Sequence, residues 1–303
     1  MKIFRTLERE RDRPLALAIG FFDGLHIGHR EIVRAALRMR KPGWRSGVLT
    51  FSNHPSSYLR PGTEPPLLFT SEERLDRFAA IGVEECFFVP FDEHVATMEP
   101  AAFLQLLEER LHVRGVAIGE TFRYGHKRAG DVAGMRAYYE GRDVAVAAEP
   151  SVTLDGERVC STRIRALVLE GEMERAEEML GEEYELRGVV ELGAGRGLGL
   201  GFPTANVRTG EKLLPKDGVY SGIARHDGRD YAALISIGTN PHFGGTARTV
   251  EAWLRDFAES IYGREIALRG LRFIREQRAF SSAAALVDQM REDRQTVAYP
   301  SFP

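Results

Sequence analysis

The pattern of secondary-structure signals in this chain of 303 residues changes near residue 183. In the first part, short apolar runs alternate with segments of helical periodicity. Residues 15–19 (LALAI) end at Gly20 and predict a buried strand, and residues 31–40 carry apolar side chains on one helical face. The alternation continues, with strand-like runs at 46–51, 86–89, 113–118 and 143–148. Ser71 is the predicted N-cap of one helix, and others begin at Pro100 and near Ala133. This alternation predicts a doubly wound, mostly parallel sheet.

The second part contains strand signals without long helices between them. Two predicted helices, residues 162–170 and 173–180, end at Gly181. The strand-like runs that follow are 184–192, 218–224, 231–237, 248–257 and 265–273, and Ser281 or Ser282 then caps a last helix. Successive strands indicate an antiparallel barrel or sandwich, and we expect a barrel closed by the terminal helix. The predicted domains are residues 1–183 and 184–303.

Composition limits the class of protein. Apolar residues make up 43% and charged residues 28%, with a net charge of −3, so there is no basic excess to suggest a nucleic-acid partner. Two cysteines, Cys86 and Cys160, are too few for a disulfide framework or a cysteine metal cluster and suit a reducing cytoplasm. We see no signal peptide and no apolar run near the roughly 20 residues that span a bilayer. The expectation is a cytoplasmic protein with no membrane or nucleic-acid partner.

The first motif that carries chemistry is residues 20–29 (GFFDGLHIGH), directly after the first strand. Open α/β folds bind ligands at the carboxyl ends of their strands, and the N-terminus of the next helix attracts phosphate. Gly24 and Gly28 allow a close approach of the backbone. His26 and His29 are three apart, so both can donate hydrogen bonds to charge that develops on one phosphate. The alternatives are turn glycines with two surface histidines, or a zinc site, for which no third ligand has a usual spacing.

The tetrad His26-x-Gly28-His29 resembles that of the nucleotidylyltransferase superfamily, in which a nucleophile attacks the α-phosphate of a nucleoside triphosphate and pyrophosphate leaves. Residues 50–55 (TFSNHP), 119–125 (GETFRYG) and 158–165 (RVCSTRIR) resemble one branch of it, the FMN adenylyltransferase module of bacterial bifunctional riboflavin kinase/FAD synthetases. Besides the catalytic His26 and His29, the resemblance implies ATP or phosphate contacts at Gly20, Phe22, Asp23, Gly24, Gly28, Thr121, Arg158, Ser161, Thr162 and Arg165, and flavin contacts at Asn53, His54, Pro55, Phe122 and Tyr124.

Two positions depart from that pattern. Thr121 stands where Asn or Asp is usual, and Cys160 replaces the first serine. A hydroxyl cannot present an amide pair, so the Thr121 contact is expected to be weaker or to run through water. Ser161 and Thr162 lie at the start of a predicted helix, where their hydroxyls can meet phosphate or simply cap the helix.

The second motif is residues 193–201 (GAGRGLGLG) followed by residues 202–206 (FPTAN). A glycine-rich loop can wrap phosphate with its N–H groups, although a flexible hairpin loop would look the same. It is not a Walker A loop, because no Gly-Lys-Ser/Thr follows. Pro203 fixes the backbone just before a hydroxyl and an amide that could meet a metal–phosphate group.

This stretch resembles the riboflavin kinase signature, as do residues 215–220 (PKDGVY), 236–243 (SIGTNPHF) and 249–257 (TVEAWLRDF), where Trp253 replaces a common histidine. The resemblance implies that Glu251 is the base for the ribityl hydroxyl and that Thr204 and Asn206 hold Mg²⁺. It also implies phosphate contacts at Gly195, Gly201 and Pro203 and flavin contacts at Asp256, Phe257 and Arg275. Strand alternation places Val250 and Ala252 on the face opposite Glu251, which without the resemblance is an ordinary exposed strand residue.

The resemblance covers nearly the whole chain and implies two reactions. The C-terminal domain phosphorylates riboflavin with ATP to give FMN, and the N-terminal domain adenylylates FMN with a second ATP to give FAD and pyrophosphate. Mg²⁺ is the expected cofactor, ATP the co-substrate, and the protein a monomer or weak homo-oligomer. The alternatives are a riboflavin kinase with a weak or inactive adenylyltransferase domain, and a non-catalytic flavin- or nucleotide-binding regulator.

Overall fold

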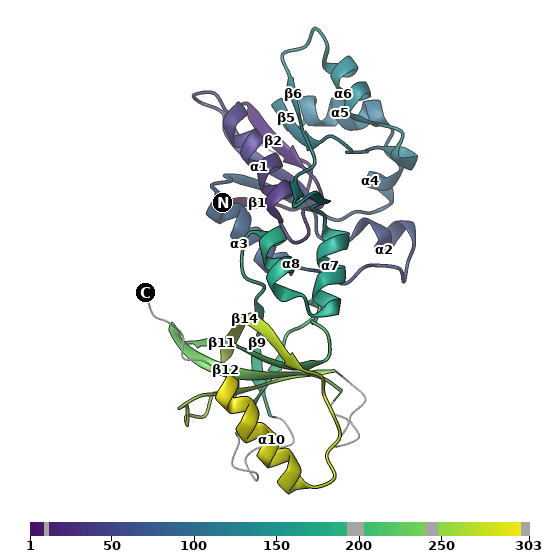
Figure 1. The fold of residues 1–303 in the computed structure, drawn as a ribbon. Coiled ribbons are helices and arrows are strands. Elements are labelled where there is room, and N and C mark those ends of the chain that lie inside the picture. The colour runs from purple at the N-terminus through teal and green to yellow at the C-terminus, as the bar shows by residue number, and fades with distance from the viewer. Residues whose placement is uncertain (9–11, 193–202, 240–247, 298–303) are drawn as a thin grey trace. The chain divides into compact units, whose positions relative to one another are not determined.

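The structure is a computed structural model that describes residues 1–8, 12–192, 203–239 and 248–297 (Figure 1). Contacts within the chain divide it into two compact units, Met1–Ser161 and Thr162–Pro303. The domain boundary predicted at residue 183 therefore falls two helices after this division. The reason is local, because both helices make contacts with the strands that follow them, as described below.

The first unit is built on a sheet of six parallel strands in the order β1-β4-β3-β2-β5-β6. The strands are β1 (Lys2–Phe4), β2 (Leu15–Ile19), β3 (Arg45–Phe51), β4 (Glu85–Val89), β5 (Val113–Gly119) and β6 (Ala145–Glu149). The predicted doubly wound parallel sheet is confirmed. Strands are added in one direction from β2 to β4 and in the other from β5 to β6, so the switch point lies between β2 and β5.

Helices cover both faces of this sheet. Helix α1 (Ile27–Met39) packs on β2, β5 and β6, whereas α5 (Pro100–Glu109) and α6 (Val132–Tyr139) pack on β5 and β6 from the other face. The odd-numbered residues of β2 enter the core cluster with Phe103, Leu104 and Leu107 of α5, so this face of the helix is buried. On the face that α1 covers, the sheet has small residues such as Gly115 of β5. A Cβ at Gly115 would lie 3.1 Å from Met39 Cε.

Shorter elements connect these layers. They are α2 (Pro55–Leu59), α3 (Ser71–Ile81), α4 (Glu93–Thr97), the 3-10 turn η1 (His126–Arg128) and the hairpin of β7 (Thr153–Leu154) and β8 (Glu157–Arg158). The N-cap of α3 is Thr70, not Ser71 as predicted. The Thr70 hydroxyl accepts from Glu73 N–H and the Glu73 carboxylate accepts from Thr70 N–H, a capping box that Ser71 cannot form with that glutamate.

The second unit is a closed antiparallel barrel with strand order β10-β13-β12-β11-β14-β9. Its strands are β9 (Leu186–Glu191), β10 (Ala205–Arg208), β11 (Gly218–His226), β12 (Arg229–Gly238), β13 (Thr249–Leu254) and β14 (Glu265–Arg275). The predicted barrel is confirmed, and β10 is a strand that the sequence did not predict. Helix α10 (Ala283–Thr296) begins after its N-cap Ser282, as expected.

Helix α10 covers the outside of the barrel. Val287 and Met290 pack against a cluster that includes Leu234 and Trp253, which are register partners on β12 and β13. A helix cannot fit inside a closed six-stranded barrel, so this face of β12 and β13 is the outer one. Arg275 of β14 fixes the helix further, because its guanidinium donates to both carboxylate oxygens of buried Asp293 at 2.7 to 3.2 Å.

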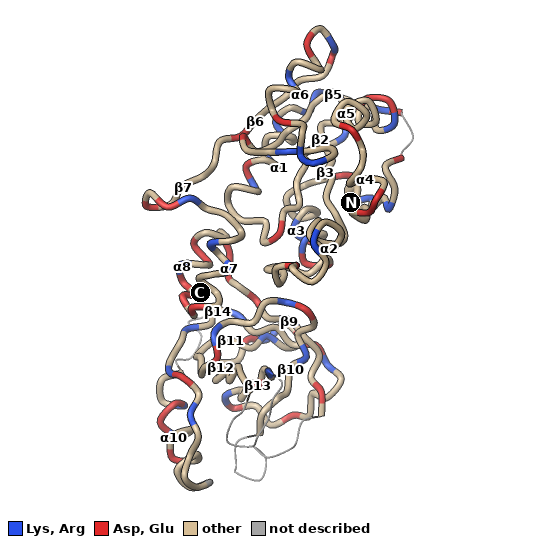
Figure 2. The backbone as a smooth tube through the Cα atoms, turned by 90° about the vertical axis from the view of Figure 1, so that its right-hand side faces the viewer, with Lys and Arg blue, Asp and Glu red and all other residues tan. Residues whose placement is uncertain are grey.

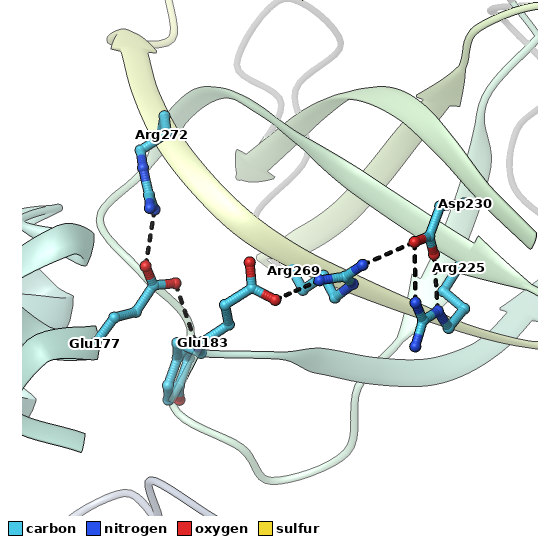
Figure 3. Close-up of polar contacts among 7 residues, drawn as sticks. Glu177, Glu183, Arg225, Asp230, Arg269 and Arg272 are labelled. Atoms are coloured by element: carbon cyan, nitrogen blue, oxygen red, sulfur yellow. Dashed lines mark hydrogen bonds and ion pairs between the residues drawn. The ribbon is translucent and has the colours of Figure 1, made fainter. Parts of the chain in front are cut away.

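Helices α7 (Ser161–Glu170) and α8 (Met173–Leu180) attach to the barrel through backbone and charged contacts. Lys216 N–H donates to Val168 O at 3.1 Å. At the end of α8 the Glu177 carboxylate accepts from Arg272 of β14 and from Tyr184 N–H (Figure 3). A neighbouring chain of ion pairs runs from Glu183 to Arg269, Asp230 and Arg225. These contacts explain why both helices group with the second unit.

Candidate active sites

The loop after β2 is held in an unusual backbone conformation. Phe22 and Leu25 have φ of 56° and 35°, and Gly24 has φ of 77°. A Cβ at Gly20 would lie 2.9 Å from atoms of the Phe22 ring, so only glycine fits there. Non-glycine residues at positive φ persist only where their surroundings fix them. This predicted phosphate loop is therefore tightly constrained.

Asp23 supplies part of that constraint. Its side chain is 1% exposed, and its carboxylate accepts from the backbone N–H groups of Leu68 and Phe69 at 3.1 Å. Ser161, at the first position of α7, donates its hydroxyl to the Asp23 carbonyl at 2.9 Å. Asp23 was predicted to contact phosphate, and the structure gives its carboxylate backbone partners inside the protein.

His26 and His29 come together at the start of α1. His26 is the N-cap, and its Nδ1 accepts from His29 N–H at 3.2 Å. The two rings stack with centroids 3.6 Å apart, and the edge of Phe22 supports His29. Burial, with the charges of Arg158 and Arg30, lowers the pKa of His26 to about 4. The ring is then neutral at physiological pH, and because Nδ1 accepts, Nε2 carries the proton and is a donor.

Thr121 and Arg158 join this group from two other elements. Thr121 follows β5, on the far side of the switch point, and its hydroxyl accepts from Arg158 Nη2 at 3.3 Å. Arg158 lies in β8 and acts electrostatically on His26. The structure thus brings His26, Thr121 and Arg158 to the carboxyl edge of the parallel sheet, where ligands bind in such folds. Ser161 begins α7 as predicted, and Thr162 and Arg165 follow in its first two turns, where their phosphate contacts stay predictions.

The predicted flavin residues of this unit lie after β3 and β5, the two neighbours of β2 in the sheet. The Asn53 amide accepts from Phe91 N–H at 2.7 Å and donates to Phe91 O and to the Ser57 hydroxyl. His54 caps α2, whose first residue is Pro55, and meets the Phe21 ring edge-on.

After β5, the rings of Phe122 and Tyr124 stack 6.0 Å apart. These predicted flavin residues therefore flank the histidine loop on both sides, and their contacts with flavin stay predictions. Phe91 and buried Arg74 also lie at this edge, and no feature of the sequence indicates their role, since neither lies in one of the motifs.

The second set of residues meets on the outer face of the barrel. Glu251 of β13 is the register partner of both Asn206 on β10 and Ser236 on β12, so the three side chains share one face. Val250 and Ala252 are buried on the other face, as alternation predicted. The Thr204 hydroxyl donates to Glu251 Oε2 at 3.4 Å.

Ser236 has a further partner, because Gln277 Nε2 donates to its hydroxyl at 2.9 Å. Neither residue was given a role from the sequence, and the register of β12 and β13 is the signal that reveals them. Exposed Pro203 directly precedes Thr204. Gly195, Gly201 and the rest of 193–202, with residues 240–243 of the neighbouring motif, lie outside the described residues.

The predicted flavin residues of the barrel are not all brought to Glu251. Arg275 is engaged by Asp293. Phe257 lies beyond the end of β13, against Tyr231 at a ring distance of 5.0 Å. Tyr231 and Ser236 are five residues apart on β12, about 16 Å along a strand. Exposed Asp256 precedes Phe257 with φ of 55°. The flavin contacts of these three residues stay predictions.

Comparison with known proteins identifies the family of the chain. Residues 8–163 match the FAD synthetase family and residues 180–299 the riboflavin kinase family. A bifunctional riboflavin kinase/FMN adenylyltransferase of Listeria monocytogenes is 33% identical and covers 96% of this chain and 93% of its own. Enzymes of the same name from Bacillus subtilis and Escherichia coli are each 30% identical, over 95% and 98% of this chain and 93% and 96% of their own.

A solved structure from Streptococcus pneumoniae has the same fold over the whole chain. It is 27% identical with a TM-score of 0.88, covers 98% of this chain and 99% of its own, and is titled a macrolide-efflux protein. In the described part of this chain, no helix is long and apolar enough to cross a membrane. The two family matches and the relatives that span nearly the full length agree with one another, and the chain belongs to the bifunctional riboflavin kinase/FMN adenylyltransferase family.

Proposed function

We propose that the two reactions of this family run at two separate sites, one in each compact unit. The chain carries both a riboflavin kinase and an FAD synthetase domain. The observation that supports separate sites is that each set of chemical groups meets within its own unit. His26, His29, Arg158 and Thr121 gather at the sheet edge, and Thr204, Asn206 and Glu251 gather on the barrel.

At the sheet edge, a phosphate oxygen of FMN attacks the α-phosphorus of ATP, and the bond to pyrophosphate breaks. His26 Nε2–H is placed to donate to charge that develops on the α-phosphate, since its Nδ1 is held by His29 N–H. Arg158 supplies a guanidinium that neutralises triphosphate charge. In this proposal Thr121 substitutes for a longer amide side chain by orienting Arg158.

On the barrel, the riboflavin 5′-hydroxyl attacks the γ-phosphorus of ATP, its proton passes to the Glu251 carboxylate, and ADP leaves. The donors present are a hydroxyl, an amide oxygen and a carboxylate, the hard ligands that Mg²⁺ prefers. Thr204 and Asn206 would hold the ion, which supplies charge neutralisation on the triphosphate when it is bound.

The substrates in this proposal are riboflavin, FMN and ATP, and the compartment is the cytoplasm, where ATP is available. Acidic and basic residues are interspersed along the backbone of each unit (Figure 2). That distribution supports the absence of a nucleic-acid partner, because nucleic-acid binding uses a concentrated basic face. The oligomeric state in this proposal is a monomer or weak homo-oligomer.

The test is a pair of substitutions in the full-length chain, with FMN and FAD separated by chromatography. We expect His29→Ala to lower FAD formation about 100-fold or more while FMN formation persists. Glu251→Gln is expected to lower FMN formation by about 100-fold or more, while supplied FMN is still converted to FAD.

Other outcomes separate the alternatives. Loss of both reactions from either substitution in a folded protein would overturn the two-site proposal. FMN that accumulates with no FAD in the unsubstituted protein would instead indicate an inactive first domain. Ligand binding without release of ADP or pyrophosphate would indicate a regulator.

A further inference from the structure

Arg74 of α3 is a fully buried arginine, with 0% of its surface exposed. Arginine is rarely buried unless its guanidinium is hydrogen-bonded, because removal of a charge from water is costly. Helix α3 lies outside every motif that the sequence carries. The question is what this guanidinium holds.

Its contacts join the ends of two strands. Arg74 Nη1 donates to Phe21 O at 3.0 Å, in the loop after β2, and Nη2 donates to Phe51 O at 3.1 Å, at the end of β3. The Thr50 hydroxyl donates to the same Phe21 carbonyl at 2.8 Å. The guanidinium also lies over the rings of Phe21 and Phe88, at 4.8 and 5.1 Å from their centroids. A planar fork thus fixes the histidine loop to the end of β3, directly before the loop that contains Asn53.

Asp23 makes the reciprocal connection. From the histidine loop it reaches the N–H groups of Leu68 and Phe69, which lead directly into the Thr70 cap of α3. Burial lowers the pKa of the Arg74 guanidinium, and the negative charge of Asp23 opposes that shift. The loop is therefore tied to α3 twice, once by a side chain from the helix and once by a side chain from the loop.

We propose that Arg74 and Asp23 are positioning residues for adenylyl transfer, which set the loop of residues 20–26 so that the His26–His29 pair meets the reacting phosphate. This inference rests on the function proposed for the first unit. The two residues bear no contact with the reacting atoms in this scheme. They act on geometry, and small displacements of reacting groups are costly, about 100-fold in rate for 1 Å.

The expected signature is a loss in kcat with little change in KM for ATP. Arg74→Met keeps the bulk of the side chain but removes both donors, and we expect kcat for FAD formation to fall roughly 100-fold. Arg74→Lys keeps the charge but cannot reach both carbonyls as a fork, so we expect partial recovery to a loss of roughly tenfold. KM for ATP should stay within about threefold in both variants.

The matched control is Arg77→Met, one turn along the same helix. Arg77 donates to Glu73 O and lies over the Phe69 ring, and both of these contacts are within the segment of α3 and its N-terminal approach. We expect this variant to keep the parent kcat. Riboflavin phosphorylation in the same molecules measures the amount of active chain, and unfolding monitored through Trp44 shows whether the first unit is folded at the assay temperature.

The outcomes separate the inference from the function beneath it. If His29→Ala abolishes FAD formation but Arg74→Met keeps the parent kcat, the positioning role is wrong and the site stands. An Arg74→Met protein that raises KM for ATP at unchanged kcat, or that loses FAD formation only in proportion to an unfolded first unit, overturns it as well. If His29→Ala leaves FAD formation intact, the proposed site itself fails.

Discussion

The stacked His26 and His29 rings show how one residue can be a hydrogen-bond donor without a charge. His26 is 5% exposed and lies near two arginines, and its Nδ1 is used by the helix it caps. Protonation would break the cap and add a third positive charge. The same surroundings that attract a triphosphate therefore keep this imidazole neutral.

The lowered pKa of His26, about 4 against an unperturbed 6.5, predicts a pH dependence of stability. Above pH 6.5 the residue is neutral in both states and contributes no slope. Between pH 6.5 and 4 only the unfolded chain takes up the proton, so stability of the first unit falls as pH falls, by about 3 kcal/mol in all. We expect His26→Asn, which keeps a good N-cap, to lose less stability over this range in denaturant unfolding followed by Trp44.

The lowered pKa of His26 also makes a prediction for the pH dependence of activity in the unsubstituted enzyme. Because His26 of the free enzyme is already neutral, kcat/KM for ATP in FAD formation should show no acid limb from this group between pH 8 and 5.5. A limb near pH 6.5 that His26→Asn removes would contradict the assignment.

At the same scale, the sequence predicted which residues gather at one edge of the sheet better than the contacts that each of them makes. Thr121 is an example, since its hydroxyl takes a hydrogen bond from Arg158 in this chain. Asp23 and Asn53 lie in the motifs, yet the side chains of both accept hydrogen bonds from backbone N–H groups about 40 residues away. Such partners depend on which segments meet in space, and no local pattern encodes them. Arg74 could not be predicted, because an arginine in a helix is normally solvated.

Among elements, strand register explains how the kinase residues meet. Asn206 and Ser236 are 30 residues apart and flank Glu251 only because β10 and β12 both pair with β13. The sequence predicted β13 from its alternation. It did not predict β10 (Ala205–Arg208), because four residues after a glycine-rich loop give too short a pattern.

Helix α10 gives a prediction at this scale. Asp293 is 3% exposed, and its carboxylate pairs with the Arg275 guanidinium, whose side chain is 20% exposed. We expect Asp293→Asn to destabilise the second unit by about 2 kcal/mol, below the range for fully buried pairs. Trp253 packs in the cluster that α10 covers, so its fluorescence in a Trp44→Phe background reports the loss.

The control for this prediction lies on the same helix. Asp288 pairs with Arg291, and both side chains are at least 66% exposed. Asp288→Asn should change stability by less than about 0.5 kcal/mol. Equal effects of the two substitutions would show that the Asp293–Arg275 pair stabilises the second unit no more than an exposed pair does.

For the molecule as a whole, the two compact units each bury their own core. Leu17 of β2 and Ile235 of β12 are both 0% exposed, and truncation of such residues costs about 2–5 kcal/mol. We expect Leu17→Ala to lower the temperature at which FAD formation is lost and to leave FMN formation unchanged. Ile235→Ala should do the reverse when FMN is supplied. Parallel loss of both activities in either variant would show that the units unfold together.

The sequence predicted this two-part architecture correctly, because the change from helix-separated strands to consecutive strands extends over long segments and does not depend on single residues. It placed the boundary at residue 183, since α7 and α8 look like the helices before them. Their attachment to the barrel depends on Glu177, Arg272 and the backbone of Lys216, contacts between distant segments that periodicity does not contain.

The alternation along β13 also has a consequence for how this family can change in length. Successive side chains on a strand point to opposite faces, so odd-numbered and even-numbered residues of β13 lie on different faces. One residue inserted between Gly238 and Glu251 that shifted the strand would send the Glu251 carboxylate into the barrel and expose Val250. Relatives that differ in length are therefore expected to take up insertions in the connections between strands and to keep the count within β13 fixed.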